Sequence, residues 1–209
     1  MVRQRVRIRF CKQDDLRFIG HRDLMRCMER LFRRAELPLK MSEGFHPKPR
    51  MTFPSALAVG IEGIDEIMEL ELAKSHAAEE LLGRLSPHVP PGLAIRSVDV
   101  LPPGAAKARV RSVCYQVPVP PRCREGLAEK IDRLLAVSSY EIQRPNRATP
   151  LDLRPLLSEL TLRDGVLRMR LQVTGQGDAR PRDVLRALDL TDLETRGVHL
   201  TRSTVEIRP

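Results

Sequence analysis

The sequence predicts an α+β protein built from two tandem ferredoxin-like domains with antiparallel sheets. Three observations lead to this prediction. Hydrophobic periodicity indicates the order β-α-β-β-α-β twice along the chain, without any repeat of the sequence itself. A length of 209 residues suits two small domains. A Pro-Pro-Gly-Ala-Ala stretch after residue 101 is typical of a linker. We therefore expect a basic N-terminal domain at residues 1–103 and a C-terminal domain at 108–209.

The N-terminal half alternates between strand and helix signals. Apolar and basic residues alternate from Val2 to Phe10, which favours a strand, and Leu24, Met28 and Leu31 recur at helical spacing. Prolines confine residues 39–57 to an edge strand or a loop. The predicted elements are a strand at 2–11, a helix at about 22–35, a strand around 67–72, a helix at 75–85 with Ser75 as N-cap, and a strand at 93–101.

The C-terminal half shows the same order less regularly. Asp164-Gly165 is a favoured hairpin turn. Pro181 is expected at the first position of a helix, where proline is tolerated. The predicted elements are a strand near 110–119, a helix at 122–137, a short strand at 140–143, a hairpin of 156–162 with 166–174, a helix at 181–188 and a strand at 198–208.

Positive charge is concentrated at the N-terminus. The first fifty residues hold fourteen Lys and Arg against six Asp and Glu, so they carry a net +8 of the chain's +9. Arginines at 3, 5, 7 and 9 would share one sheet face, and Arg22, Arg26, Arg30 and Arg33 one helix face. Residues 51–100 are net −5. This pattern favours a phosphate-bearing ligand or self-association, with an ordinary solvated face as the alternative.

Composition narrows the class of protein. No apolar run reaches the roughly eighteen residues of a membrane span, and MVRQRVRIRF is not a signal peptide, so we expect a cytoplasmic protein without membrane contact. Four scattered cysteines form no CxxC pair, and Cys11 and Cys27 fall on apolar faces as core residues. Neither a zinc site nor an iron–sulfur cluster is indicated. We expect no metal and no cofactor.

Two basic segments of the N-terminal half are candidate sites. His21 and Arg22 lie at the start of the predicted helix. One interpretation is that they bind a phosphate there; the other is that His21 or Gly20 only caps the helix. In residues 41–53, prolines keep the chain extended and place His46, Lys48 and Arg50 on one side, while Gly44 allows close approach of a ligand. Phe45 and Phe53 would stack on bases or, as we favour, join the core.

Two loops of the C-terminal half are weaker candidates. The loop at 144–155 carries Arg147, and in it Asp152 and Arg154 are expected to pair and fix the loop. The segment Thr174 to Arg182 combines Gly175 and Gly177 with Arg180 and Arg182 at a helix start, a layout similar to a phosphate cradle. It lacks the Gly-Lys-Ser/Thr ending of a P-loop.

Taken together, several motifs resemble the bacterial radical SAM-linked protein family, a domain of unknown function found alone or at the C-terminus of larger radical SAM proteins. The motifs are RIRF at 7–10, DLRFIGHRDLMR at 15–26, SEGFHPKPR at 42–50, LDLRP at 151–155 and the stretch 175–185. Asparagine is common in the family at His46 and serine at Gly20. The resemblance implies a radical SAM enzyme as partner, often encoded near RNA-processing genes, and no established reaction.

Three functions follow as hypotheses. The favoured one is a non-catalytic accessory module that binds RNA or another phosphate-bearing substrate for a radical SAM enzyme. The second is an adaptor that docks on that enzyme. The third is a metal-independent endoribonuclease similar to the CRISPR RNA-processing enzymes, with His21 or His46 as general acid or base. The expected binding residues are Arg5, Arg7, Arg9, Arg17, His21, Arg22, Arg26, Gly44, His46, Lys48, Arg50, Arg147, Asp152, Arg154, Gly175, Gly177, Arg180 and Arg182.

Overall fold

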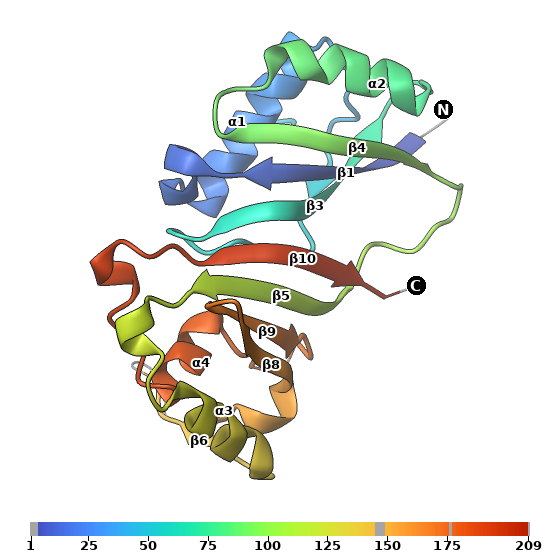
Figure 1. Ribbon diagram of the computed structural model, residues 1–209. Helices are drawn as coiled ribbons and strands as arrows, with labels where there is room; N and C mark the ends of the chain where they lie inside the picture. Colours follow the sequence, from blue (N-terminus) through green and yellow to red (C-terminus); the bar gives the residue numbers. More distant parts are fainter. Residues whose placement is uncertain (1–3, 145–148, 176, 209) are drawn as a thin grey trace. The chain divides into compact units, whose positions relative to one another are not determined.

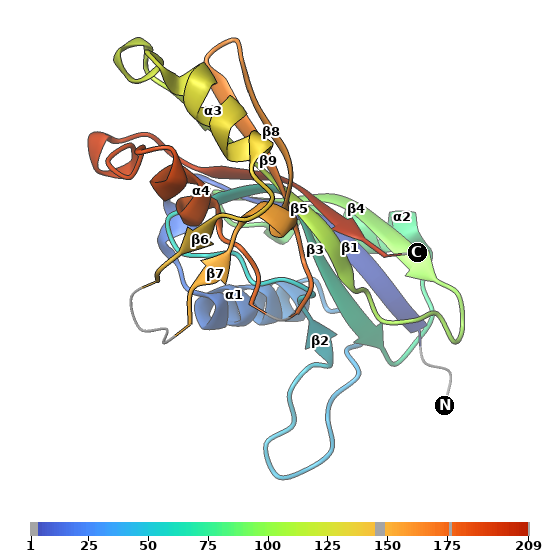
Figure 2. The ribbon, with the colours of Figure 1, turned by 90° about the horizontal axis from the view of Figure 1, so that it is seen from below.

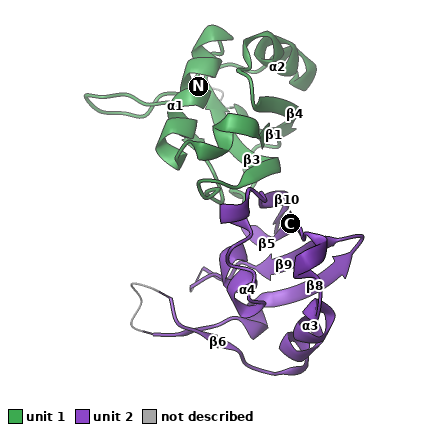
Figure 3. Ribbon diagram, turned by 60° about the vertical axis from the view of Figure 1, so that its left-hand side comes forward, with its two compact units in different colours: residues 1–109 green, residues 110–209 purple. Residues whose placement is uncertain are grey.

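The computed structural model describes residues 4–144, 149–175 and 177–208 (Figure 1). The protein has a mixed α+β fold, and the strand pairs named below are all antiparallel. The chain divides into two compact units, residues 1–109 and 110–209 (Figure 3).

The first unit is a sheet with two helices on one face. Its strand order is β4-β1-β3, with the short β2 paired to β3. Because Val6, Ile8 and Phe10 point to one side of β1, they share a buried core with Met28 and Leu81 of the helices. The elements are β1 (Gln4–Lys12), α1 (His21–Arg34), β2 (Met51–Thr52), β3 (Glu62–Leu72), α2 (Ala78–Leu85) and β4 (Leu93–Leu101), with short 3-10 turns at Asp14–Phe18 and Ser86–His88.

The second unit has the sheet order β10-β5-β9-β8, and β6 and β7 form a separate pair. Leu167, Met169 and Leu171 of β9 are buried, so the residues between them face the other way. The elements are β5 (Val110–Pro118), α3 (Leu127–Ala136), β6 (Glu141–Ile142), β7 (Leu151–Asp152), β8 (Leu157–Arg163), β9 (Val166–Gln172), α4 (Pro181–Ala187) and β10 (Thr201–Ile207), with 3-10 turns at Pro121–Cys123, Arg154–Leu156 and Glu194–Arg196.

Two predicted helix starts are wrong. Helix α2 begins at Ala78 with Ala77 as N-cap, not at Ser75. The side chain of Gln4 accepts a hydrogen bond from the amide of His76 (2.9 Å) and donates one to its carbonyl (2.8 Å), which ties residue 76 to β1. Helix α3 begins at Leu127, because Gly126 has a left-handed φ of 64° that ends the preceding turn.

Other predicted features agree with the structure. Asp164 and Gly165 both have positive φ, 52° and 73°, as a two-residue hairpin turn between β8 and β9 requires. Cys11 is buried and Cys27 is half-buried. Among the described residues, no helix is long and apolar enough to cross a bilayer.

Candidate nucleic-acid interface

The arginines of β1 are paired within the first unit. Antiparallel register places Arg7 opposite Glu69, and Arg7 Nη2 lies 2.9 Å from Glu69 Oε1. Arg5 Nε lies 3.8 Å from the other oxygen of this carboxylate, which is almost fully buried. Arg9 Nη1 lies 2.6 Å from Asp65 Oδ2. The acidic segment of the sequence therefore neutralises the strand face that we expected to meet an anion, which argues against phosphate binding by these three arginines.

Arg17 and Arg50 also have acidic neighbours. Arg17 Nη1 lies 3.8 Å from Glu62 Oε1, and its guanidinium stacks over the Phe18 ring at 4.3 Å. Arg50 is more loosely held: Nη1 lies 3.6 Å from Glu71 Oε2 and Nη2 lies 4.0 Å from Glu43 Oε1. Arg50 also lines a surface hollow of about 330 Å³. Of the two, Arg50 is the more available to a ligand.

Helix α1 carries a row of exposed basic side chains. Arg22, Arg26, Arg30 and Arg33 recur at helical spacing, all four are exposed, and we call them the α1 arginine ridge. At 1.5 Å per residue the ridge is roughly 16 Å long. Arg26 pairs with Asp23 at 3.2 Å, and Arg33 with Glu29 at 2.6 Å.

The other two arginines of the ridge are not part of these ion pairs. Within the described parts of the chain, Arg22 and Arg30 make no ion pair. Arg34 follows the ridge, is exposed as well, and donates to the carbonyl of His88. The ridge therefore offers two guanidinium groups that no described carboxylate neutralises.

His21 is the first residue of α1 and packs inward. Its ring meets the Phe53 ring edge-on with centroids 5.2 Å apart, and Phe53 in turn meets Phe10 of the core at 6.1 Å. Its Nδ1 is shielded from solvent and has no hydrogen-bond partner among the described residues. Gly20, not His21, is the N-cap residue. Packing explains this histidine better than contact with a phosphate.

Residues 40–50 form a hairpin that extends from the body of the first unit (Figure 2). The amide of Ser42 donates to the carbonyl of Lys48 at 2.8 Å, and Arg50 N donates to Lys40 O at 2.8 Å. Gly44 has φ 116°, and residues 43–48 are all exposed, His46 and Lys48 included. Phe45 is fully exposed, so its predicted place in the core is wrong, whereas Phe53 does pack against the core.

The glycine-bearing loop of the second unit is closed by a carboxylate of the protein. Asp178 Oδ1 accepts from the amides of Thr174 (2.7 Å) and Gly175 (3.0 Å), two donors that a phosphate would use. Gly177 lies in the same turn with φ 90°. Arg182 is engaged by Glu194, whose hydrogen bonds raise the pKa of its guanidinium. The expected cradle is therefore already filled from within.

Residues of the 144–155 loop have structural roles. The expected side-chain pair of Asp152 and Arg154 is wrong: Asp152 Oδ1 accepts from the backbone amides of Tyr140 (2.8 Å) and Arg154 (3.1 Å), and these bonds lower its pKa. The Arg154 guanidinium donates to the carbonyls of Leu135 and Leu157. Arg147 lies outside the described residues.

A buried ion pair anchors α4. Arg144 and Asp183 form a two-point salt bridge that is almost fully shielded, and Arg144 also donates to Asp178 O at 2.8 Å. Asp183 accepts from the amide of Arg180 at 2.8 Å as well. Arg180 itself is exposed. Sequence reasoning missed this pair, because 39 residues separate its members.

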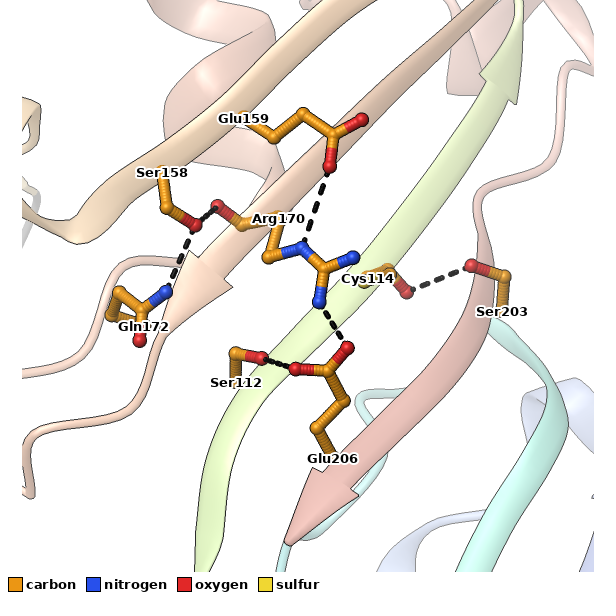
Figure 4. A network of polar contacts seen from close by, with 8 residues as sticks. All are labelled: Ser112, Cys114, Ser158, Glu159, Arg170, Gln172, Ser203 and Glu206. Carbon is orange, nitrogen blue, oxygen red and sulfur yellow. Dashed lines mark hydrogen bonds and ion pairs between the residues drawn. The ribbon is translucent and has the colours of Figure 1, made fainter. Parts of the chain in front are cut away.

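A polar network covers the face of β9 opposite its buried leucines (Figure 4). Arg170 of β9 lies between Glu159 of β8 and Glu206 of β10, and Ser112 of β5 donates to Glu206 at 2.5 Å. Burial raises the pKa of the neighbouring Cys114 thiol, although Arg170 opposes this effect. At neutral pH Cys114 is therefore a protonated thiol. The hydrogen bonds of the network link four strands, β8, β9, β5 and β10, so its role is structural.

This network predicts a pH-dependent stability. The hydrogen bonds from Ser112 and Arg170 lower the pKa of Glu206 below its ordinary 4.5, so the charged form is favoured in the folded state. The charged Glu206 carboxylate therefore stabilises the folded state fully above pH 4.5, and this stabilisation is lost as the pH falls through the lowered pKa. We expect Glu206→Gln to lower the urea midpoint at pH 7, and to lower it by progressively less as the pH falls below 4.5. A loss that stays the same at every pH from 7 to well below 4.5 would contradict the role of the carboxylate charge.

Comparison with known proteins identifies a family. Residues 5–181 match the bacterial family DUF2344, described as an uncharacterized protein conserved in bacteria. The chain belongs to this family. The comparison with curated proteins finds no match.

Among solved structures, an unknown protein from Galdieria sulphuraria is 13% identical with a TM-score of 0.31, and the match covers 100% of both chains. A protein assigned as a glycine cleavage system transcriptional repressor is 12% identical with a TM-score of 0.29, over 100% of this chain and 99% of the other. Scores this low assign neither fold to the DUF2344 chain.

Proposed function

We propose that this protein is a non-catalytic accessory module that binds RNA or another phosphate-bearing substrate for a radical SAM enzyme. The observation that carries the RNA part is the α1 arginine ridge, in which Arg22 and Arg30 have no ion pair among the described residues. Arginine presents a planar set of donors that matches phosphate oxygens in two-point contacts. The 40–50 hairpin adds the exposed His46 and Lys48.

We interpret the two units as tandem ferredoxin-like domains, at residues 1–103 and 108–209. What supports this is the strand order within each unit. It is β4-β1-β3-β2 in the first and β10-β5-β9-β8 in the second, so the last strand of each sheet stands beside its first. An antiparallel sheet of this order with two crossing helices suits the β-α-β-β-α-β arrangement.

The radical SAM partner rests on the sequence resemblance. An adaptor role without RNA would use the same exposed arginines on an acidic protein surface. The two are separated by mixing the purified protein with a radical SAM enzyme of the same organism, with and without RNA, and measuring coelution. Coelution that needs no RNA and persists in high salt would favour the adaptor.

The nuclease alternative has less support. A general acid or base must reach the scissile phosphate, and the His21 ring is packed edge-on against Phe53. His46 is exposed on the hairpin. Incubation of labelled RNA with the protein in EDTA, followed by a denaturing gel, tests this point. We expect intact RNA, and fragments that disappear with His21→Ala would favour the nuclease.

Charge reversal on the ridge tests the RNA part. We expect Arg22→Glu combined with Arg30→Glu to weaken binding of a labelled structured RNA at least tenfold in fluorescence anisotropy at low salt, because two phosphate contacts become repulsions. The matched control reverses two exposed arginines of the second unit, Arg122→Glu with Arg163→Glu. Equal weakening by both pairs would mean that only net charge matters, and the ridge would not be the site.

A further inference from the structure

The tip of the 40–50 hairpin presents an isolated aromatic ring. Phe45 has a relative exposure of 103%, and in the described part of the chain its ring contacts no other ring. A phenylalanine that is fully exposed to water lacks the stabilisation that burial of its ring would give. Exposed aromatic rings next to basic residues are typical of proteins that bind single-stranded nucleic acid. Both faces of the ring are open to a ligand.

The hairpin holds this ring in a defined place. Its arms are joined by the Ser42–Lys48 and Lys40–Arg50 backbone bonds, and the amide of Lys48 also donates to the Ser42 hydroxyl at 3.0 Å. Pro47 and Pro49 restrict one arm, and proline loses little conformational entropy on ordering. A preorganised ring binds with a smaller entropic cost than a ring on a disordered loop.

Basic residues follow the ring along the same hairpin. His46 and Lys48 follow Phe45 and are exposed, and Arg50 at the base is held by Glu71 only at 3.6 Å. Glu43 is the acidic residue of the tip, and it lies 4.0 Å from Arg50. An open aromatic face with an imidazole one residue away and a lysine three residues away suits a nucleotide, in which the base stacks and the phosphate meets a cation.

We propose that Phe45 stacks on an unpaired base, so that the ligand of this surface is a single-stranded segment of RNA. The inference rests on the proposed function and specifies its substrate. Bases within an RNA helix are already stacked on their neighbours and offer no free face, so a duplex does not engage Phe45. Lys48 and His46 would meet the phosphates beside the stacked base.

The chain allows a direct reporter of this contact, since it contains no tryptophan. The Phe45→Trp variant places a single indole at the tip, and the Phe18→Trp variant places one at an exposed control position (58%) of the same unit. We expect a twelve-nucleotide oligo(U) to quench the indole fluorescence of Phe45→Trp saturably. A twelve-base-pair RNA duplex should leave that fluorescence unchanged, and neither probe should affect the fluorescence of Phe18→Trp.

Two further variants separate stacking from a general apolar contact. We expect Phe45→Ala to weaken oligo(U) binding by about 5- to 150-fold in anisotropy, the usual range for loss of one stacked base, with unchanged circular dichroism. Phe45→Leu should weaken it nearly as much, because leucine has no aromatic face. Affinity of Phe45→Leu equal to that of the wild type would overturn the stacking.

The outcomes distinguish this inference from the proposed function. If RNA binds but the indole of Phe45→Trp does not respond and Phe45→Ala binds normally, the inference is wrong while the function stands. If no RNA binds at low salt, both fail. If the indole of Phe45→Trp responds to a purified radical SAM enzyme and not to oligo(U), the tip is a protein contact and the inference is overturned.

Discussion

Asp183→Ala should lower the free energy of unfolding by about 3–5 kcal/mol, because it leaves the Arg144 guanidinium buried without its counter-charge. The change also removes the acceptor of the Arg180 amide at the start of α4. Urea denaturation at pH 7, followed by circular dichroism, measures the loss.

The control for this variant is Asp192→Ala. Asp192 pairs with Arg196 at the surface, where both side chains are 44% exposed, so its removal should cost no more than about 1 kcal/mol. The double variant Arg144→Leu with Asp183→Leu should recover much of the stability, since no charge is then left uncompensated. If Asp183→Ala lowered the free energy of unfolding by less than about 1 kcal/mol, the Arg144–Asp183 pair would not be a buried salt bridge that stabilises the fold.

Glu69→Gln should have the second-largest effect, on stability and on binding together. The Glu69 side chain is 2% exposed and is shared by Arg5 and Arg7, so the variant should lose about 1–3 kcal/mol of unfolding free energy. It also leaves two arginines of β1 without their carboxylate. We therefore expect tighter RNA binding in low-salt anisotropy.

Glu79→Gln is the matched control, because Glu79 is exposed on α2 and its change adds the same net charge. It should leave stability unchanged and alter RNA affinity only slightly. If both variants raised the affinity equally, the Glu69 carboxylate would not be what withholds Arg5 and Arg7 from RNA.

Local patterns predicted most of the elements. The alternation in residues 93–101 gives the bounds of β4, and apolar spacing gives α1 within one residue at each end. A long-range contact explains one of the two wrongly predicted helix starts. The start of α2 depends on Gln4, 72 residues from His76, and no local signal reports that contact.

The candidate site was predictable only where it depends on local spacing. The charge pattern identifies the helix arginines, since exposure on a helix follows from spacing alone. It does not reveal that Asp178 fills the glycine loop or that Glu69 neutralises β1, because both depend on which residues the fold brings together. Phe45 was misplaced because an aromatic residue usually joins the core, and only the hairpin geometry puts it in solvent.

The salt dependence of RNA binding tests the central claim most directly. Anisotropy titrations of the wild type and of the Arg22→Glu, Arg30→Glu double variant, in EDTA from low to physiological salt, give the slope of log K against log salt for each. If the ridge holds phosphates, the wild type shows a steep negative slope, and the double variant loses about 0.7–0.9 from its magnitude for each contact removed. A wild type that binds no RNA at low salt, or a variant with the same slope and affinity, would contradict the account.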